Sequence, residues 1–114
     1  YKYRTTTMSI WNFLSNGNRI SSYKKTYTST TWNLDSTKIS HADVNGDGRE
    51  DLVALYNYGN ANTGFWVFLK TASSYTAQRW WLSGKGAWNW SSTNLQVGDT
   101  NNDGKDDIVP IYKY

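Results

Sequence analysis

The chain has 114 residues, a formal net charge of +3, seven tryptophans, nine tyrosines and no cysteine. This length allows one ordinary domain or two small repeated units, and the lack of cysteine excludes a disulfide framework. No apolar run approaches the roughly 18 residues of a membrane-spanning helix, so we expect no membrane insertion. Because the first residue is Tyr1 rather than an initiator methionine, we interpret the sequence as a processed product or an excised fragment.

The N-terminal segment has the composition of β-structure. "SIWNFL" at residues 9–14 is short, rich in aromatic and β-branched residues, and followed by Asn16-Gly17. Such a segment is typical of a strand, and Asn-Gly is a strong signal for a hairpin turn. We therefore expect a β-hairpin here, followed by a strand that leads into an unusual loop.

That loop, "DVNGDGRED" at residues 43–51, has a counterpart in "DTNNDGKDD" at residues 99–107. Together the two stretches contain every acidic residue of the chain except Asp35. In each loop, three carboxylates recur at every fourth position. Like charges so close together repel one another unless a cation lies among them.

The opening Asp-x-Asn-x-Asp-Gly matches the first half of an EF-hand loop, which binds calcium through oxygen atoms. Gly48 and Gly104 occupy the sixth position, where the loop turns sharply, but Ala54 and Pro110 replace the bidentate Glu of the twelfth. No helical pattern flanks either loop, so we predict two strand-loop-strand sites that bind one structural Ca²⁺ each. The predicted ligands are Asp43, Asn45, Asp47, the Arg49 carbonyl, Asp51, Asp99, Asn101, Asp103, the Lys105 carbonyl and Asp107. Asn-Gly and Asp-Gly alone would also favour plain hairpin turns, which is the alternative.

The two halves of the chain repeat one unit. "LVALYNY" at 52–58 matches "IVPIYKY" at 108–114 with a period of 56, and "IWNFL" at 10–14 matches "FWVFL" at 65–69. We predict an all-β fold with about four strands per unit, the size of a propeller blade. The expected repeats are residues 1–58 and 59–114, with strand exchange between repeats or protomers. Because two blades cannot close a propeller, we expect a homo-oligomer.

The acidic loop followed by an apolar strand resembles the FG-GAP/VCBS repeats of integrin-like β-propellers. The longer string "SGKGAWNWSSTNLQVGDTNNDGKDDIVPIY" at 83–112 is similar to repeats of secreted actinobacterial proteins and, more loosely, of bacterial propeller lectins. The resemblance covers almost the entire chain. It implies calcium ligation by the Asp and Asn residues of the loops, and a secreted protein. It leaves the activity open, because such repeats occur in adhesins, lectins and appendages of glycoside hydrolases.

The tryptophans are candidates for ligand binding. Indole faces stack on sugar C–H surfaces, and Ser, Asn and backbone amides orient the hydroxyls. The candidates are Trp80, Trp81, Trp88, Trp90 and Trp32. Trp32 and Trp88 recur at equivalent positions of the repeat and could instead pack between blades, whereas Trp80, Trp81 and Trp90 align with Lys24, Lys25 and Leu34 in the first repeat. Such divergence favours a surface position.

An enzyme is not expected. The single histidine, His41, is replaced by Val97 in the second repeat, and no nucleophile motif surrounds any serine. The basic residues are scattered rather than clustered, so we do not expect nucleic acid as a partner. The sequence thus predicts a calcium-binding β-propeller module that binds glycan. A protein-interaction or adhesion module, or a self-assembling propeller fragment without ligand, are the alternatives.

Overall fold

The computed structural model describes residues 2–4 and 6–114, and in this part of the chain it contains β-strands, turns and two short 3-10 helices. This confirms the all-β prediction. No helix within the described residues is long and apolar enough to cross a membrane. The chain divides into two compact units, Tyr1–Asp35 and Ser36–Tyr114.

The first unit is a three-stranded antiparallel sheet in the order β1 (Lys2–Arg4), β2 (Thr7–Ser15) and β3 (Ile20–Ser29). The turn between β2 and β3 contains the predicted Asn16-Gly17 pair. Asn16 Oδ1 accepts a hydrogen bond of 3.1 Å from the Arg19 N–H, and Gly17 has φ of +104°, which glycine adopts without steric cost. The predicted hairpin is therefore confirmed.

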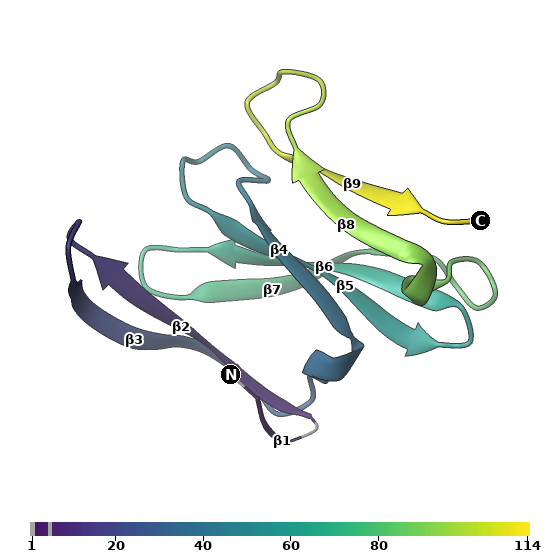
Figure 1. Ribbon diagram of the computed structural model, residues 1–114, viewed down its shortest axis with the longest axis horizontal. Helices are drawn as coiled ribbons and strands as arrows, with labels where there is room; N and C mark the ends of the chain where they lie inside the picture. Colours follow the sequence, from purple (N-terminus) through teal and green to yellow (C-terminus); the bar gives the residue numbers. More distant parts are fainter. Residues whose placement is uncertain (1, 5) are drawn as a thin grey trace. The chain divides into compact units, whose positions relative to one another are not determined.

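The second unit contains a four-stranded antiparallel meander of β4 (Thr37–Ala42), β5 (Asp51–Gly59), β6 (Asn62–Lys70) and β7 (Tyr75–Leu82). A two-stranded sheet of β8 (Thr93–Gly98) and β9 (Asp107–Tyr112) follows it (Figure 1). The 3-10 helices η1 (Leu34–Ser36) and η2 (Trp90–Ser92) precede β4 and β8. The acidic loops are the β4–β5 and β8–β9 connections.

One apolar core joins the two sheets of the second unit. Its buried members are Ala42, Val44, Val53 and Val67, and the partly buried Leu69, Leu95, Val97 and Ile108 pack against them. Fully burying a valine side chain such as Val53 or Val67 contributes roughly 1.5–3 kcal/mol. Because this core contains residues from both sheets, it holds the two acidic loops at the same end of the unit (Figure 1).

The boundaries of the sheets do not coincide with those of the predicted repeats. β5 and β6 pair from Leu52↔Phe68 to Gly59↔Asn62, so one sheet includes residues from both sides of the expected boundary between 58 and 59. Four strands per sheet are found in β4–β7, whereas the other two sheets of the described residues have three and two strands. The repeats 1–58 and 59–114 remain a prediction about sequence units, and closure of a propeller remains a prediction as well.

Candidate functional site

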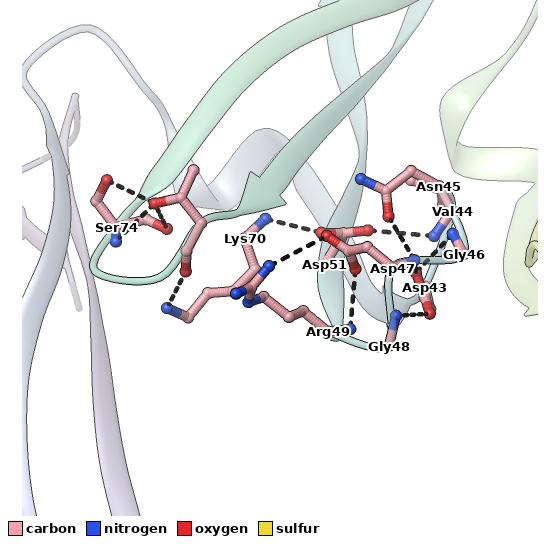
Figure 2. Close-up of polar contacts among 11 residues, drawn as sticks. Asp43, Val44, Asn45, Gly46, Asp47, Gly48, Arg49, Asp51, Lys70 and Ser74 are labelled. Atoms are coloured by element: carbon pink, nitrogen blue, oxygen red, sulfur yellow. Dashed lines mark hydrogen bonds and ion pairs between the residues drawn. The ribbon is translucent and has the colours of Figure 1, made fainter.

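The first acidic loop wraps its backbone around one carboxylate. Asp43 Oδ1 accepts from the Gly46 N–H at 2.9 Å and the Asp47 N–H at 3.2 Å, while Oδ2 accepts from the Gly48 N–H at 2.9 Å. Asn45 Oδ1 accepts from the Asp47 N–H at 3.3 Å. Figure 2 shows these bonds inside the loop. The side-chain oxygens of the first and third loop positions are thus held in place by backbone N–H groups.

Asp51, at the ninth position, is fully buried and ties the loop to the sheet. One carboxylate oxygen accepts from the Lys70 N–H at 2.7 Å and the other from the Val44 N–H at 3.2 Å (Figure 2). Burial raises the pKa of Asp51, and the nearby charges of Asp47 and Asp43 raise it further, while the two N–H bonds act in the opposite direction. In this structure the Asp51 carboxylate therefore accepts hydrogen bonds from the backbone of the loop and of β6.

The second acidic loop repeats this hydrogen-bond pattern. Asp99 accepts from the Asp103 N–H at 3.2 Å and the Gly104 N–H at 2.9 Å, and Asp103 accepts from the Lys105 N–H at 2.9 Å, as Asp47 does from the Arg49 N–H. Gly48 and Gly104 share φ values of +84° and +85°. The two loops therefore have closely similar local structures.

The ninth position differs between the loops. Asp107 Oδ2 accepts from the N–H of Thr100 at 2.8 Å and from its hydroxyl at 2.6 Å. These two bonds lower the pKa of Asp107, whereas the pKa of Asp51 is raised by its burial. The difference arises because Asp51 lies against β6, while β9 pairs with β8 alone in the described part of the chain.

The donor set of each loop suits a hard cation. In residues 2–4 and 6–114, no three His, Cys, Asp or Glu side chains form a group that could by itself hold a metal ion. Calcium, however, also takes amide and backbone carbonyl oxygens. Asp43 and Asp47 are carboxylates whose oxygens keep acceptor capacity after receiving N–H bonds. With Asn45 and the Arg49 carbonyl, they provide the mixed oxygen set that calcium prefers.

Two predicted ligand-binding tryptophans lie on β7. Trp80 and Trp81 are 48% and 40% exposed. The Trp81 ring lies 5.3 Å from that of Phe65 and 5.9 Å, edge to face, from that of Trp88, measured between ring centroids. Trp88 in turn lies 4.7 Å from the ring of Tyr112. The structure thus brings Trp81 and Trp88 together into one aromatic cluster, which also includes Tyr112.

Trp88 is held firmly in this cluster. Its N–H donates to the Ala61 carbonyl at 2.9 Å, its indole N–H donates to Thr93 Oγ1 at 2.9 Å, and its carbonyl accepts from Thr63 Oγ1 at 2.9 Å. The β5–β6 turn and the start of β8 therefore fix the position of the ring.

Two other predicted ligand residues contribute to packing. The Trp90 indole N–H donates to the Leu55 carbonyl at 2.7 Å, and Lys38 Nζ lies 4.4 Å from the centre of the Trp90 ring. Trp32, in the first unit, is only 7% exposed. Packing is the alternative that the sequence left open for Trp32.

The sheet register corrects the alignment of the two repeats around Trp81. Trp81 lies opposite Phe65, and Tyr27 lies opposite Ile10 at the equivalent place in the first unit. The counterpart of Trp81 is therefore Tyr27 and not Lys25. The β2–β3 hairpin has a register shift between Leu14 and Ser15 that the β6–β7 hairpin lacks, and this shift changes the alignment of β3 with β7. An aromatic residue is thus present at this position in both repeats.

Sequence reasoning missed an open pocket of about 310 Å³ beside β8 and β9. It is lined by residues 91–94 and 111–113, and one of them, Tyr112, belongs to the aromatic cluster. These residues are 17 or more positions apart in sequence and form no motif, so the pairing of β8 with β9 is what brings them together. His41 lies elsewhere, on β4 at the edge of its sheet, where its exposed Nδ1 contacts Glu50 Oε2 at 2.8 Å.

Comparison with known protein families matches most of the second unit of the chain, including both acidic loops, to a repeat family. The model of the FG-GAP-like repeat matches residues 43–109, which run from the first acidic loop to the start of β9 and cover more than half of the chain. No curated protein and no solved structure gives a significant match.

Proposed function

The chain belongs to the FG-GAP-like repeat family, and on this premise we propose that it is a secreted, calcium-binding β-propeller-like module that binds carbohydrate. The observation that carries the calcium proposal is the shared hydrogen-bond pattern of the two acidic loops. In both loops the first-position carboxylate accepts from the N–H groups of the fifth and sixth residues. A plain turn does not need acidic side chains repeated in this pattern, whereas a cation site does.

Each loop would hold one ion through its first, third and fifth side chains and the carbonyl of the seventh residue. These are Asp43, Asn45, Asp47 and Arg49 in the first loop, and Asp99, Asn101, Asp103 and Lys105 in the second. Asp51 and Asp107 complete the predicted sets at the ninth position. A bound calcium ion would neutralise the repulsion among the carboxylates, so its binding would stabilise the fold.

Calcium binding is tested by thermal unfolding with calcium and with a chelator, together with elemental analysis of the purified protein. We expect two calcium ions per chain and a lower melting temperature after chelation. At 100 times the dissociation constant, one bound ion stabilises the folded state by about 2.7 kcal/mol. Asp47→Asn should reduce the calcium effect, while Asp35→Asn, outside the loops, should not. No bound metal and an unchanged melting temperature would refute the proposal.

The carbohydrate proposal is carried by the position of the aromatic cluster. The exposed Trp81 ring offers a flat apolar face, and Tyr112 links the cluster to a pocket lined by Ser91, Thr93 and Asn94. Apolar faces next to hydroxyl and amide groups are the combination that recognises sugars. Few carboxylates remain outside the acidic loops for acid–base chemistry, so binding without catalysis is the proposed activity.

A glycan array tests this activity. We expect the wild type to bind at least one glycan and Trp81→Ala to weaken binding about fivefold, since a stacked aromatic contact contributes roughly 1 kcal/mol. Trp11→Ala is the matched control, because Trp11 is also partly exposed, at 37%, but lies in the first unit. If no glycan binds, the protein-interaction module becomes the better proposal, and the lectin proposal fails.

A further inference from the structure

The two acidic loops are joined directly to each other by a pair of hydrogen bonds. The Asp43 N–H donates to Asp106 Oδ2 at 2.8 Å, and the Asp106 N–H donates to the Asp43 carbonyl at 2.7 Å. Asp106 therefore holds the backbone of the residue that opens the first loop. We refer to this pair of bonds as the Asp106 clasp.

The clasp lies within a close contact between the loops. A Cβ atom at Gly46 would lie 3.2 Å from both the Gly104 carbonyl oxygen and Lys105 Cγ, so a side chain at this position would press on the second loop. Val44, in the first loop, packs in the same core as Leu95 and Val97 of β8. The two loops are thus packed against each other, so a movement of one affects the other.

Asp106 is distinct from the predicted calcium ligands. It lies outside the every-fourth-residue pattern, and its carboxylate faces the other loop. Its equivalent in the first repeat is Glu50, which contacts the exposed His41 at 2.8 Å. The same sequence position therefore contributes to a contact between loops in one repeat and to a surface contact in the other.

From this geometry we propose that Asp106 is a positioning residue that couples the two cation sites, so that binding at one loop strengthens binding at the other. The inference rests on the proposed calcium function. An ion in the second loop would fix the backbone around Lys105, its seventh-position ligand. Asp106 is the next residue, and through the clasp it would fix Asp43, the first ligand of the other site.

The coupling follows from the shared cost of ordering. If the second loop is already ordered, the first loop loses less conformational freedom on binding, which produces positive cooperativity without a change of fold. Coupling is reciprocal, so the ion in the first loop strengthens binding in the second by the same factor. A typical coupling changes affinity by about fivefold or more.

Calcium titration by calorimetry tests the coupling. We expect two ions to bind the wild type cooperatively, and Asp106→Ala to keep both ions but lose the cooperativity, with about fivefold weaker binding of the second ion. Asp106→Asn, which keeps an acceptor oxygen, should restore part of the coupling. Glu50→Ala is the matched control and should titrate as the wild type does. Identical cooperativity in the wild type and in Asp106→Ala would overturn the inference.

Amide hydrogen exchange gives a readout that does not depend on metal. In calcium-free protein, the Asp43 amide should be protected in the wild type and exchange at least tenfold faster in Asp106→Ala, while the Val53 amide in β5 keeps its protection and shows that the sheet is intact. Equal exchange at Asp43 in the two proteins would overturn the clasp. If the wild type binds no calcium, the proposed function and the coupling of sites fail, and the exchange result then decides the clasp alone.

Discussion

Asp51 shows how strongly one residue of the acidic loop is committed to the fold. Both of its carboxylate oxygens accept backbone N–H bonds, and the side chain is fully buried. Asp51→Asn replaces one acceptor by an N–H₂ group, which would face the N–H of Val44 or Lys70. A buried donor without a partner costs about 1–3 kcal/mol. We therefore predict that this variant loses about 1–3 kcal/mol in the free energy of unfolding, measured by urea denaturation without calcium.

Asp107→Asn is the matched control for this prediction. Asp107 occupies the same loop position, but its carboxylate oxygen pairs with Thr100 at an exposed site. Water can replace a lost partner there, so the loss of stability should be clearly smaller than for Asp51→Asn. Equal losses in the two variants would show that burial does not set the role of Asp51.

The difference in burial between Asp51 and Asp107 could not be predicted from the sequence. The spacing of the carboxylates was enough to predict two equivalent loops, and the repeated hydrogen bonds of Asp43 and Asp99 agree with that equivalence. Burial of Asp51 depends on the Lys70 N–H at the end of β6, which lies 19 residues away. A local pattern contains no information about which strand later packs against a loop.

At the scale of elements, the β5–β6 turn supports the aromatic cluster at a conformational cost. Asn60 and Ala61 have φ values of +54° and +52°, and the Ala61 carbonyl accepts from the N–H groups of Ala87 and Trp88. The left-handed conformation is unfavourable for alanine by about 1–2 kcal/mol, whereas glycine adopts it readily.

Ala61→Gly should therefore stabilise the protein. Glycine removes the cost of the unfavourable φ. It also gives the unfolded chain more conformational freedom, which destabilises the folded state by only about 0.4–1 kcal/mol. We predict a net gain of about 0.5–1 kcal/mol in the free energy of unfolding. Ala54→Gly is the control, because Ala54 is fully buried in the middle of β5 and its replacement should destabilise the sheet. A loss of stability in both variants would contradict the assigned strain at Ala61.

Local patterns predicted elements well when the signal lay within the element. Asn16-Gly17 marked the β2–β3 turn, and the aromatic and β-branched run at residues 9–14 marked β2. The alignment of Trp81 failed because the β2–β3 hairpin has a register shift between Leu14 and Ser15 that the β6–β7 hairpin lacks, and such an irregularity leaves no clear sequence signal. The pocket beside Tyr112 was missed because strand pairing, not sequence proximity, assembles it.

At the scale of the whole molecule, equivalent residues differ sharply in exposure. Phe68 in β6 is fully buried, whereas its repeat counterpart Phe13 in β2 is 57% exposed. Leu55 in β5 is fully buried, whereas Ile111 in β9 is 59% exposed. Both exposed residues belong to sheets of fewer than four strands. Burial of an apolar side chain stabilises a protein. We therefore expect a partner to cover the surfaces around Phe13 and Ile111.

We propose that a second copy of the chain covers these surfaces. Within the described residues, β1 pairs with β2 only at Thr7 and Met8. If β9 of one copy continued along that edge of β2 in another copy, as β5 pairs with β6, Ile111 would lie opposite Ile10, just as Leu55 lies opposite Phe65. We predict by light scattering a mass that is a multiple of the 114-residue chain, and a lower mass for Ile111→Lys, because a charge in the new sheet would be buried without a partner. Ser73→Lys, in the exposed β6–β7 turn, should leave the mass unchanged. A wild type that stays a single chain in calcium would contradict this assembly, since the exposed Phe13 and Ile111 would then have no copy to cover them.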